Sequence, residues 1–283
     1  MTAFREGRVT AQDGLALYYR DYGDALSPRT PLLCLTGLTR NSADFAALAK
    51  RHSGERRVLC PDYRGRGRSA YDPDWRNYDP RTYVGDIIHL VAAAGIERAV
   101  VVGTSLGGLL AMALAVAKPA MLAGVVINDI GPDVAPGGVS RIFDYIGVDQ
   151  PQPDWPSAVR YLRTLLPTLS IRTAEGLLEM AQATYRQGED GLLHFDWDVT
   201  LAKPLVAARN DVPDLWPYFR ALGRRPALAL RGALSDVLSP ETFARMGAEK
   251  PDLEQVTVEN AGHAPTLNEP EAAAAVDGFI RRF

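Results

Sequence analysis

The chain has few of the residues that cross-link a fold or bind metals. Its 283 residues include only two cysteines, Cys34 and Cys60, and four histidines. Two cysteines cannot form a disulfide framework or a four-cysteine zinc site. No spacing of potential ligands indicates a metal site, and no glycine-rich loop after a first strand indicates a nucleotide-binding site. We therefore expect a protein with no metal and no cofactor.

An excess of charge of one sign is also missing. The 31 Lys and Arg residues nearly balance the 34 Asp and Glu residues, which gives a formal net charge of −3. Without a basic stripe, nucleic acid is not an expected partner. The N-terminal segment has charges at Arg5, Glu6 and Arg8, where a signal peptide needs its apolar core. We therefore expect a cytoplasmic protein whose two thiols are free.

Long hydrophobic runs are scarce, and one needs an explanation. Residues 99–117 carry no charge, so they imitate a membrane span, which needs about 20 such residues. The run opens with the β-branched Val100-Val101-Val102 and continues into Gly-Thr-Ser-Leu-Gly-Gly, which interrupts any continuous helix. Only residues 109–118 then show a helical pattern, which Pro119 ends. We therefore predict a buried strand, a tight turn and a buried helix, and no membrane partner.

Short apolar runs alternate with helical patterns over much of the chain. After a predicted hairpin at residues 8–19, the predicted strands lie at 31–35, 57–60, 99–102, 124–127, 226–230 and 255–258. The predicted helices lie at 43–51, 82–94, 109–118 and 269–283. Strands without polar interruptions that alternate with helices indicate an α/β fold, with a mostly parallel sheet covered on both faces.

The alternation stops between residues 131 and 222. This span is rich in proline, has helical patches such as 174–185, and contains no convincing strand. We predict that residues 131–222 form a helical cap inserted between the sixth and seventh strands. The core of the fold then comprises residues 1–130 and 223–283.

The predicted turn after residue 102 carries the candidate nucleophile. Gly103-Thr104-Ser105-Leu106-Gly107 fits the pattern G-x-S-x-G and lies between an apolar strand and an apolar helix. The turn is so sharp that its flanking positions favour glycine, and it exposes the serine hydroxyl above the carboxyl edge of the sheet. The N–H of Leu106, at the start of the helix, can donate to an oxyanion.

A serine needs an adjacent base at neutral pH, and elimination among the histidines leaves His263. His52 ends a polar helix, His89 lies off the apolar stripe of its helix, and His194 lies in the cap. His263 follows the last predicted strand, on a loop at the carboxyl edge of the sheet. It is therefore the predicted general base for Ser105.

Two aspartates are candidates for the group that orients the imidazole. Asp236 follows the strand that ends near Leu230. The order Ser105, Asp236, His263 is the one typical of hydrolases whose serine lies in a G-x-S-x-G turn. Asp129 ends the preceding strand and can approach the same histidine. We predict Asp236 as the acid and keep Asp129 as the alternative.

The second oxyanion donor is predicted in the loop after the strand at 31–35. Thr36-Gly37-Leu38 supplies a glycine for close approach and the N–H of Leu38. In Pro61 to Ser69, Asp62, Arg64, Arg66 and Arg68 could form an anion site, but we favour a structural loop in which Asp62 accepts backbone hydrogen bonds. The aromatic residues of the cap and its return are expected to be mostly core, with one or two in a pocket: Trp155, Phe195, Trp197, Trp216, Tyr218 and Phe219.

These motifs together resemble the α/β-hydrolase superfamily over nearly the whole chain. The segments that carry the resemblance are the serine turn, the Pro61–Ser69 loop, Arg231-Gly232 through Asp236, and Gly262-His263. The resemblance implies the α/β-hydrolase fold, an eight-stranded, mostly parallel sheet with flanking helices and a helical lid after strand 6. It is nearest to the capped esterases, lactonases and carbon–carbon bond hydrolases. One departure is Thr36, where the family usually has histidine, and it weakens the assignment of Leu38.

The sequence therefore predicts a serine hydrolase acting on a small or medium carboxylic ester or lactone. Ser105 would attack the carbonyl, His263 would move the proton, and the Leu38 and Leu106 N–H groups would stabilise the oxyanion. Two alternatives stay open. One is carbon–carbon bond hydrolysis, amide hydrolysis or lyase chemistry at the same triad, and the other is a small-molecule receptor. The natural substrate and the oligomeric state do not follow from the sequence.

Overall fold

A single eight-stranded sheet organises the fold in the computed structural model, which describes residues 3–135, 137–138, 142, 145–208 and 213–283. The strand order is β1-β2-β4-β3-β5-β6-β9-β10. The strands are β1 (Arg5–Thr10), β2 (Ala16–Tyr22), β3 (Leu32–Leu35), β4 (Val58–Pro61), β5 (Ala99–Thr104), β6 (Leu122–Asn128), β9 (Ala227–Gly232) and β10 (Leu253–Val258).

The sheet is mostly parallel, which confirms the predicted α/β-hydrolase architecture. β1 pairs with β2, and β2 with β4, in antiparallel fashion, and every other neighbouring pair is parallel. All residues of β3, β4, β6 and β9 are buried. Their mostly apolar sequences follow from this, because a parallel strand in mid-sheet has helices on both faces.

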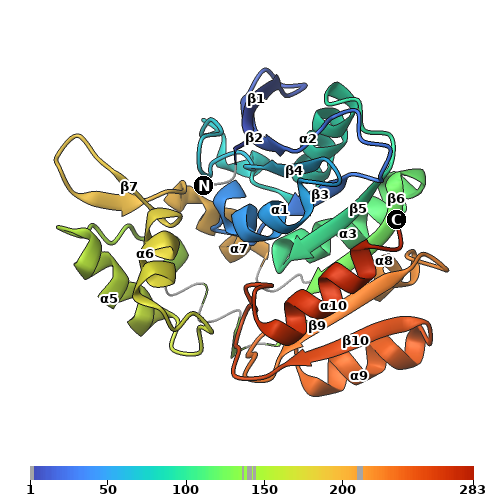
Figure 1. Cartoon of the computed structure of the whole chain (residues 1–283). Helices are drawn as coiled ribbons and strands as arrows, with labels where there is room; N and C mark the ends of the chain where they lie inside the picture. Colours follow the sequence, from blue (N-terminus) through green and yellow to red (C-terminus); the bar gives the residue numbers. More distant parts are fainter. Residues whose placement is uncertain (1–2, 136, 139–141, 143–144, 209–212) are drawn as a thin grey trace.

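Helices cover both faces of the sheet (Figure 1). One buried cluster joins the sheet to α2 (Pro80–Ala93) and α3 (Leu106–Ala117), and the other joins it to α1 (Ala46–His52) and α10 (Pro270–Ile280). α9 (Pro240–Glu249) contacts β10 at the edge. Short 3-10 turns lie at Ser42–Phe45, Trp75–Asn77, Pro119–Met121 and Val199–Leu201. Among the described residues, no helix combines the length and apolar composition needed to cross a membrane.

The span between β6 and β9 includes residues 155–187, which stand apart from the sheet at one end (Figure 1). It contains α5 (Trp155–Leu165), α6 (Ala174–Gln182), β7 (Tyr185–Gln187), β8 (Leu193–Phe195), α7 (Ala202–Ala208) and α8 (Trp216–Arg220). The expectation of a cap without strands is wrong, because β7 and β8 form an antiparallel hairpin. α8 packs against α3 of the core. The predicted cap boundaries at 131 and 222 stay a prediction.

Candidate active site

Ser105 occupies a sharp turn between β5 and α3. Its backbone has φ 52° and ψ −117°, a left-handed conformation that a non-glycine residue adopts only under strain. A Cβ on Gly107 would lie 2.0 Å from the Leu35 carbonyl oxygen, and one on Gly103 would lie 2.3 Å from the Gly107 carbonyl oxygen. The two glycines are therefore required by close backbone contacts, as the motif predicts.

His263 lies on the loop after β10 and reaches the serine. Its Nε2 is 2.8 Å from the Ser105 Oγ, within hydrogen-bond distance, and its side chain is 10% exposed. The structure thus brings together the two residues that the sequence singled out. The hydroxyl can donate to Nε2 when the proton of the neutral imidazole is on Nδ1, which is the arrangement a general base requires.

The other three histidines have different surroundings. His52 is buried at the end of α1 with its Nε2 2.8 Å from Asp277, and burial lowers its pKa. His194 lies in the cap with its Nδ1 2.6 Å from Asp149. His89 is half-buried on α2. Of the four histidines, His263 is the one hydrogen-bonded to Ser105.

Asp129 holds the other side of the imidazole. Its Oδ2 lies 2.7 Å from the His263 Nδ1 and accepts a hydrogen bond of 2.6 Å from the Ser235 hydroxyl. Its Oδ1 accepts a 2.7 Å hydrogen bond from the Gly232 N–H. The residue is fully buried at the end of β6, at φ 55°. A buried carboxylate that accepts from three donors is held in one position and is well placed to orient the imidazole.

The assignment of Asp236 to this position is therefore wrong. Asp236 is exposed, whereas Asp129 is fully buried beside His263. β6 and β9 are neighbouring parallel strands, so an acid after either strand emerges at the same edge of the sheet. The loop after β9 still contributes, because Gly232 and Ser235 donate to Asp129.

The predicted oxyanion donors belong to the start of α3 and to the loop after β3. Leu106 is the first residue of α3, where a backbone N–H has no partner within its own helix. Leu38 lies on the loop after β3 and lines the cavity described below. Its carbonyl accepts a 2.7 Å hydrogen bond from Nε of the fully buried Arg66. Arg66 thus anchors the loop that carries the Leu38 N–H, a role that no local sequence pattern reveals.

The Pro61–Ser69 loop is built on buried hydrogen bonds, as the structural interpretation predicts. Asp62 accepts from the Ser42 N–H at 2.6 Å and from the Arg68 N–H at 2.9 Å. The Arg64 guanidinium, 1% exposed, forms ion pairs with Asp72 and Asp86. The charge of Arg64 is thus neutralised inside the protein, which favours a structural role for this loop.

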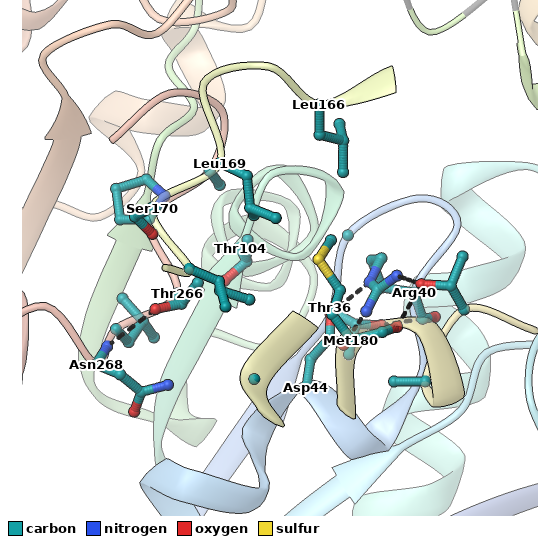
Figure 2. A pocket seen from close by; sticks show the side chains of 18 of the residues that line it. Thr36, Arg40, Asp44, Thr104, Leu166, Leu169, Ser170, Met180, Thr266 and Asn268 are labelled. Atoms are coloured by element: carbon teal, nitrogen blue, oxygen red, sulfur yellow. Dashed lines mark hydrogen bonds and ion pairs between the residues drawn. The ribbon is translucent and has the colours of Figure 1, made fainter. Parts of the chain in front are cut away.

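A cavity of about 660 Å³ opens above Ser105 and His263, between the core and the cap. Figure 2 shows Arg40 and Met180 on one side of it and Ser170, Thr266 and Asn268 on the other, with Thr104 between them. Much of the wall that the cap supplies is apolar: Leu162, Leu165, Leu166, Leu169, Ile171, Met180 and Trp197. Of the aromatic residues singled out in the sequence, Trp197 lines this cavity.

A segment of the cap, residues 166–173, is attached to the loop that carries His263; we call it the strap. The Thr168 carbonyl accepts a 2.9 Å hydrogen bond from the Gly262 N–H, one residue before the histidine. The Ser170 hydroxyl donates to Glu269, which also accepts from the Thr266 N–H at 2.8 Å. The strap therefore couples the cap directly to the position of the imidazole.

Gly262→Ala should lower kcat through this contact. A Cβ at residue 262 would lie 1.9 Å from the Thr168 Oγ1, so either the strap or the histidine loop must move. A displacement of about 1 Å can cost about 10² in rate, and we expect a loss of 10–100-fold in kcat. Gly85→Ala on α2 is the matched control, because a Cβ there meets nothing within 4 Å. Equal activity of the two variants would contradict the coupling.

A second contact, made by a half-buried carboxylate, ties the cap to the core. Asp196, next to β8, accepts a 3.1 Å hydrogen bond from the side-chain amide of Asn41, which follows the oxyanion loop. Burial, reinforced by the nearby charge of Asp62, raises the pKa of Asp196 from 3.8 to about 6. In the folded protein this group therefore binds a proton over a pH range in which the unfolded chain has released it.

Asp196→Asn should remove a pH-dependent cost in stability. The pKa of Asp196 is higher in the folded protein than in the unfolded chain. Its contribution to the free energy of unfolding therefore becomes less favourable as the pH rises from about 4 to about 6. At about 1.4 kcal/mol per pKa unit, the raised pKa of Asp196 lowers the free energy of unfolding at high pH by at most about 3 kcal/mol. We expect the variant to match wild type near pH 4 and to exceed its unfolding free energy by about 1–3 kcal/mol at pH 8. Urea unfolding at several pH values measures this, and a less stable variant at pH 8 would refute it.

Two further observations describe the chemistry available. Within the described ranges, no group of three or more His, Cys, Asp or Glu side chains is arranged to hold a metal ion. Cys34 and Cys60 are free and fully buried in β3 and β4, and burial raises the pKa of the Cys60 thiol well above its ordinary value. A buried thiol that resists ionisation is not a nucleophile.

Comparison with known proteins identifies the family of this chain. A model of the alpha/beta hydrolase family matches residues 32–276, which include all three residues of the Ser105–His263–Asp129 array. The chain belongs to the alpha/beta hydrolase family. This membership, together with its hydrolase relatives, supports hydrolase activity.

Three relatives illustrate the match. The chain is 36% identical over 271 residues to a 3-hydroxybutyrate-oligomer hydrolase from Cupriavidus necator, covering 93% of this chain and 92% of the relative. It is 28% identical to a 2-(acetamidomethylene)succinate hydrolase from Mesorhizobium japonicum, covering 88% and 87%. The crystal structure of an alpha/beta hydrolase from Novosphingobium aromaticivorans is 44% identical, with TM-score 0.93 and full coverage of both chains.

Proposed function

We propose that this member of the alpha/beta hydrolase family is a serine ester hydrolase that cleaves small or medium carboxylic esters or lactones through an acyl-enzyme. The observation that carries the proposal is the continuous hydrogen-bonded array from Ser105 Oγ to His263 and on to Asp129, at the floor of a cavity. These side chains match the roles of nucleophile, general base and orienting acid.

In the first half of the proposed reaction, Ser105 Oγ attacks the carbonyl carbon and His263 Nε2 takes the hydroxyl proton. The imidazolium that forms is stabilised by the Asp129 carboxylate, 2.7 Å from Nδ1. The negative charge that develops on the carbonyl oxygen accepts hydrogen bonds from the Leu38 and Leu106 N–H groups. Removal of one such donor typically costs about 10²–10³ in kcat.

The tetrahedral intermediate then collapses, and its bond to the alcohol oxygen breaks. His263 gives its proton to that oxygen, so a neutral alcohol leaves and an ester on Ser105 remains. In the second half, His263 removes a proton from water, which attacks the acyl carbon. The proton returns to Ser105 Oγ as the carboxylic acid departs, and the enzyme is restored.

The substrate class we favour is an ester of a hydroxy acid. The relative from Cupriavidus necator, which aligns with nearly the whole chain, is named for hydrolysis of 3-hydroxybutyrate oligomers. A cavity of about 660 Å³ has the size of sites that hold small organic ligands. Its apolar cap wall suits the aliphatic carbons of such an ester.

Release of 4-nitrophenol from esters, acetate to octanoate, tests the activity. We expect repeated turnover by the wild-type protein and a preference for the short to medium acyl groups. A fast first equivalent of 4-nitrophenol would indicate that the acyl-enzyme accumulates. Release that stops after one equivalent would instead favour a receptor, and no release from any ester would contradict the esterase assignment.

An amide hydrolase is the second candidate. The relative from Mesorhizobium japonicum is named for a substrate that carries an acetamido group, and the chain covers 87% of it. The same nucleophile and oxyanion donors serve acyl transfer from either an ester or an amide. Turnover of N-acyl 4-nitroanilides with no turnover of the matching 4-nitrophenyl esters would favour this candidate.

A further inference from the structure

Arg40 is a charged side chain close to the proposed oxyanion loop. It follows the loop after β3 and lines the cavity (Figure 2). A Cβ on Gly37 would lie 3.4 Å from the Arg40 Cγ and 3.8 Å from the Ser105 Cβ. Ser105 and Arg40 therefore both lie close to Gly37 and border the same cavity, which one small substrate molecule can occupy.

The guanidinium is held in a fixed orientation. Its Nε and Nη2 donate to the two carboxylate oxygens of Asp44 at 2.8 and 2.6 Å, and its Nη1 donates to the Thr184 hydroxyl of the cap. A guanidinium has five N–H groups, so these contacts use three of them. One N–H on Nη1 and one on Nη2 remain beyond these three contacts and can donate to a ligand. Such a pair matches the two oxygens of a carboxylate.

The charge of Arg40 is secured by its surroundings. Burial disfavours the charged form, but the attraction and hydrogen bonds of Asp44 outweigh burial, so the pKa of Arg40 is raised. The side chain is 18% exposed. A cationic side chain that is mostly buried and already oriented loses little conformational entropy when it binds an anion, because its position is fixed beforehand.

We propose that Arg40 binds a free carboxylate of the substrate, so that the enzyme prefers esters that carry a carboxylate. This rests on the proposed ester hydrolase function and narrows it. An oligomer or monoester would be held by its acidic end while Ser105 attacks the ester bond within reach. In an oligomer, the bond that is cleaved would then lie at a fixed distance from the free carboxyl end, and cleavage would proceed stepwise from that end.

The kinetic test uses two pairs of substrates in which a methyl group replaces the carboxylate. One pair is monoethyl glutarate and ethyl pentanoate, and the other is 3-(butanoyloxy)butanoate and butan-2-yl butanoate. For at least one pair, wild-type kcat/KM should favour the acid by about 10–100-fold, the range expected for hydrogen bonds from a charged donor. Arg40→Gln should lower kcat/KM for that acid by 10–100-fold more than for its neutral partner. Equal losses on both would mean that Arg40 only ties the oxyanion loop to the cap.

Arg172→Gln is the matched control. Arg172 also lines the cavity, but it is exposed and its Nη2 contacts the Asn260 carbonyl at 3.4 Å. The preference for the acid should be unchanged in this variant. If it is lost in Arg172→Gln and kept in Arg40→Gln, the proposed carboxylate site is wrong.

A binding measurement separates this proposal from the proposed function. Titration calorimetry of monoethyl glutarate into Ser105→Ala, and into Ser105→Ala with Arg40→Gln, needs no turnover. We expect binding to the first protein and affinity weakened by 10–100-fold in the second. Equal affinity would overturn the carboxylate site even if ester hydrolysis is observed. A selective loss would support the site even if the wild type hydrolyses none of the esters.

Discussion

Asp129→Asn should lower kcat for 4-nitrophenyl butanoate by about 10⁴, whereas Asp236→Asn should leave it within a few-fold of wild type. In the first variant, Oδ1 can still accept from the Gly232 N–H, which turns the amide nitrogen toward His263 Nδ1. Nδ1 must then accept rather than donate, and the ring proton moves to Nε2. His263 in that tautomer cannot take the proton of Ser105.

The two asparagine variants control for each other. Both remove one carboxylate from the same edge of the sheet, but Asp236 is exposed and Asp129 is fully buried. Thermal unfolding of each shows whether the protein is folded at the assay temperature. A large loss of kcat in Asp236→Asn with full activity in Asp129→Asn would reverse the assignment.

Ser105→Ala should abolish turnover, with kcat lower by about 10⁴–10⁶. The methyl group cannot form the ester bond with the acyl group, and His263 loses the hydroxyl 2.8 Å from its Nε2. Steady-state hydrolysis of 4-nitrophenyl butanoate measures the loss. Activity close to wild type would show that Ser105 is not the nucleophile.

Ser105→Gly is the informative companion variant. Ser105 has φ 52°, a region that glycine adopts readily and other residues adopt at a cost of about 1–3 kcal/mol. We therefore expect Ser105→Gly to be as inactive as Ser105→Ala but more stable than it, by roughly 1 kcal/mol in urea unfolding. A less stable glycine variant would contradict the strain at this turn.

The sequence predicted the central strands and the serine turn well, for a physical reason. β5 and β6 are buried on both faces, so their apolar runs are continuous and short. Gly103 and Gly107 are required by backbone contacts within the same short segment. Features that depend on local sterics and on burial can therefore be predicted from the sequence. His263 could be predicted because the chain has only four histidines, and three of them could be eliminated.

The acid could not be decided in this way. Asp129 and Asp236 follow adjacent strands, and the choice depends on which carboxylate turns inward to meet His263. A left-handed backbone at residue 129 and the donors Gly232 and Ser235 make that choice. These are tertiary contacts, and the spacing of the two aspartates does not reveal them.

The cap was predicted least well. β7 and β8 have three residues each, too few to show an alternating pattern, although Gly188 to Gly191 between them contains the residues of a turn. The hydrogen bonds from Arg66 to Leu38 and from Arg40 to Thr184 join residues that are far apart in the chain. Such roles emerge only when the fold is known.

Covalent labelling by diethyl 4-nitrophenyl phosphate identifies the nucleophile of the enzyme and needs no assumption about the natural substrate. The serine hydrolase account predicts one equivalent of 4-nitrophenol, and mass spectrometry should find one diethylphosphoryl group per chain, on Ser105. Labelling should be much slower in Asp129→Asn than in Asp236→Asn. A modified residue other than Ser105, or a wild-type protein that takes up no label, would contradict the account.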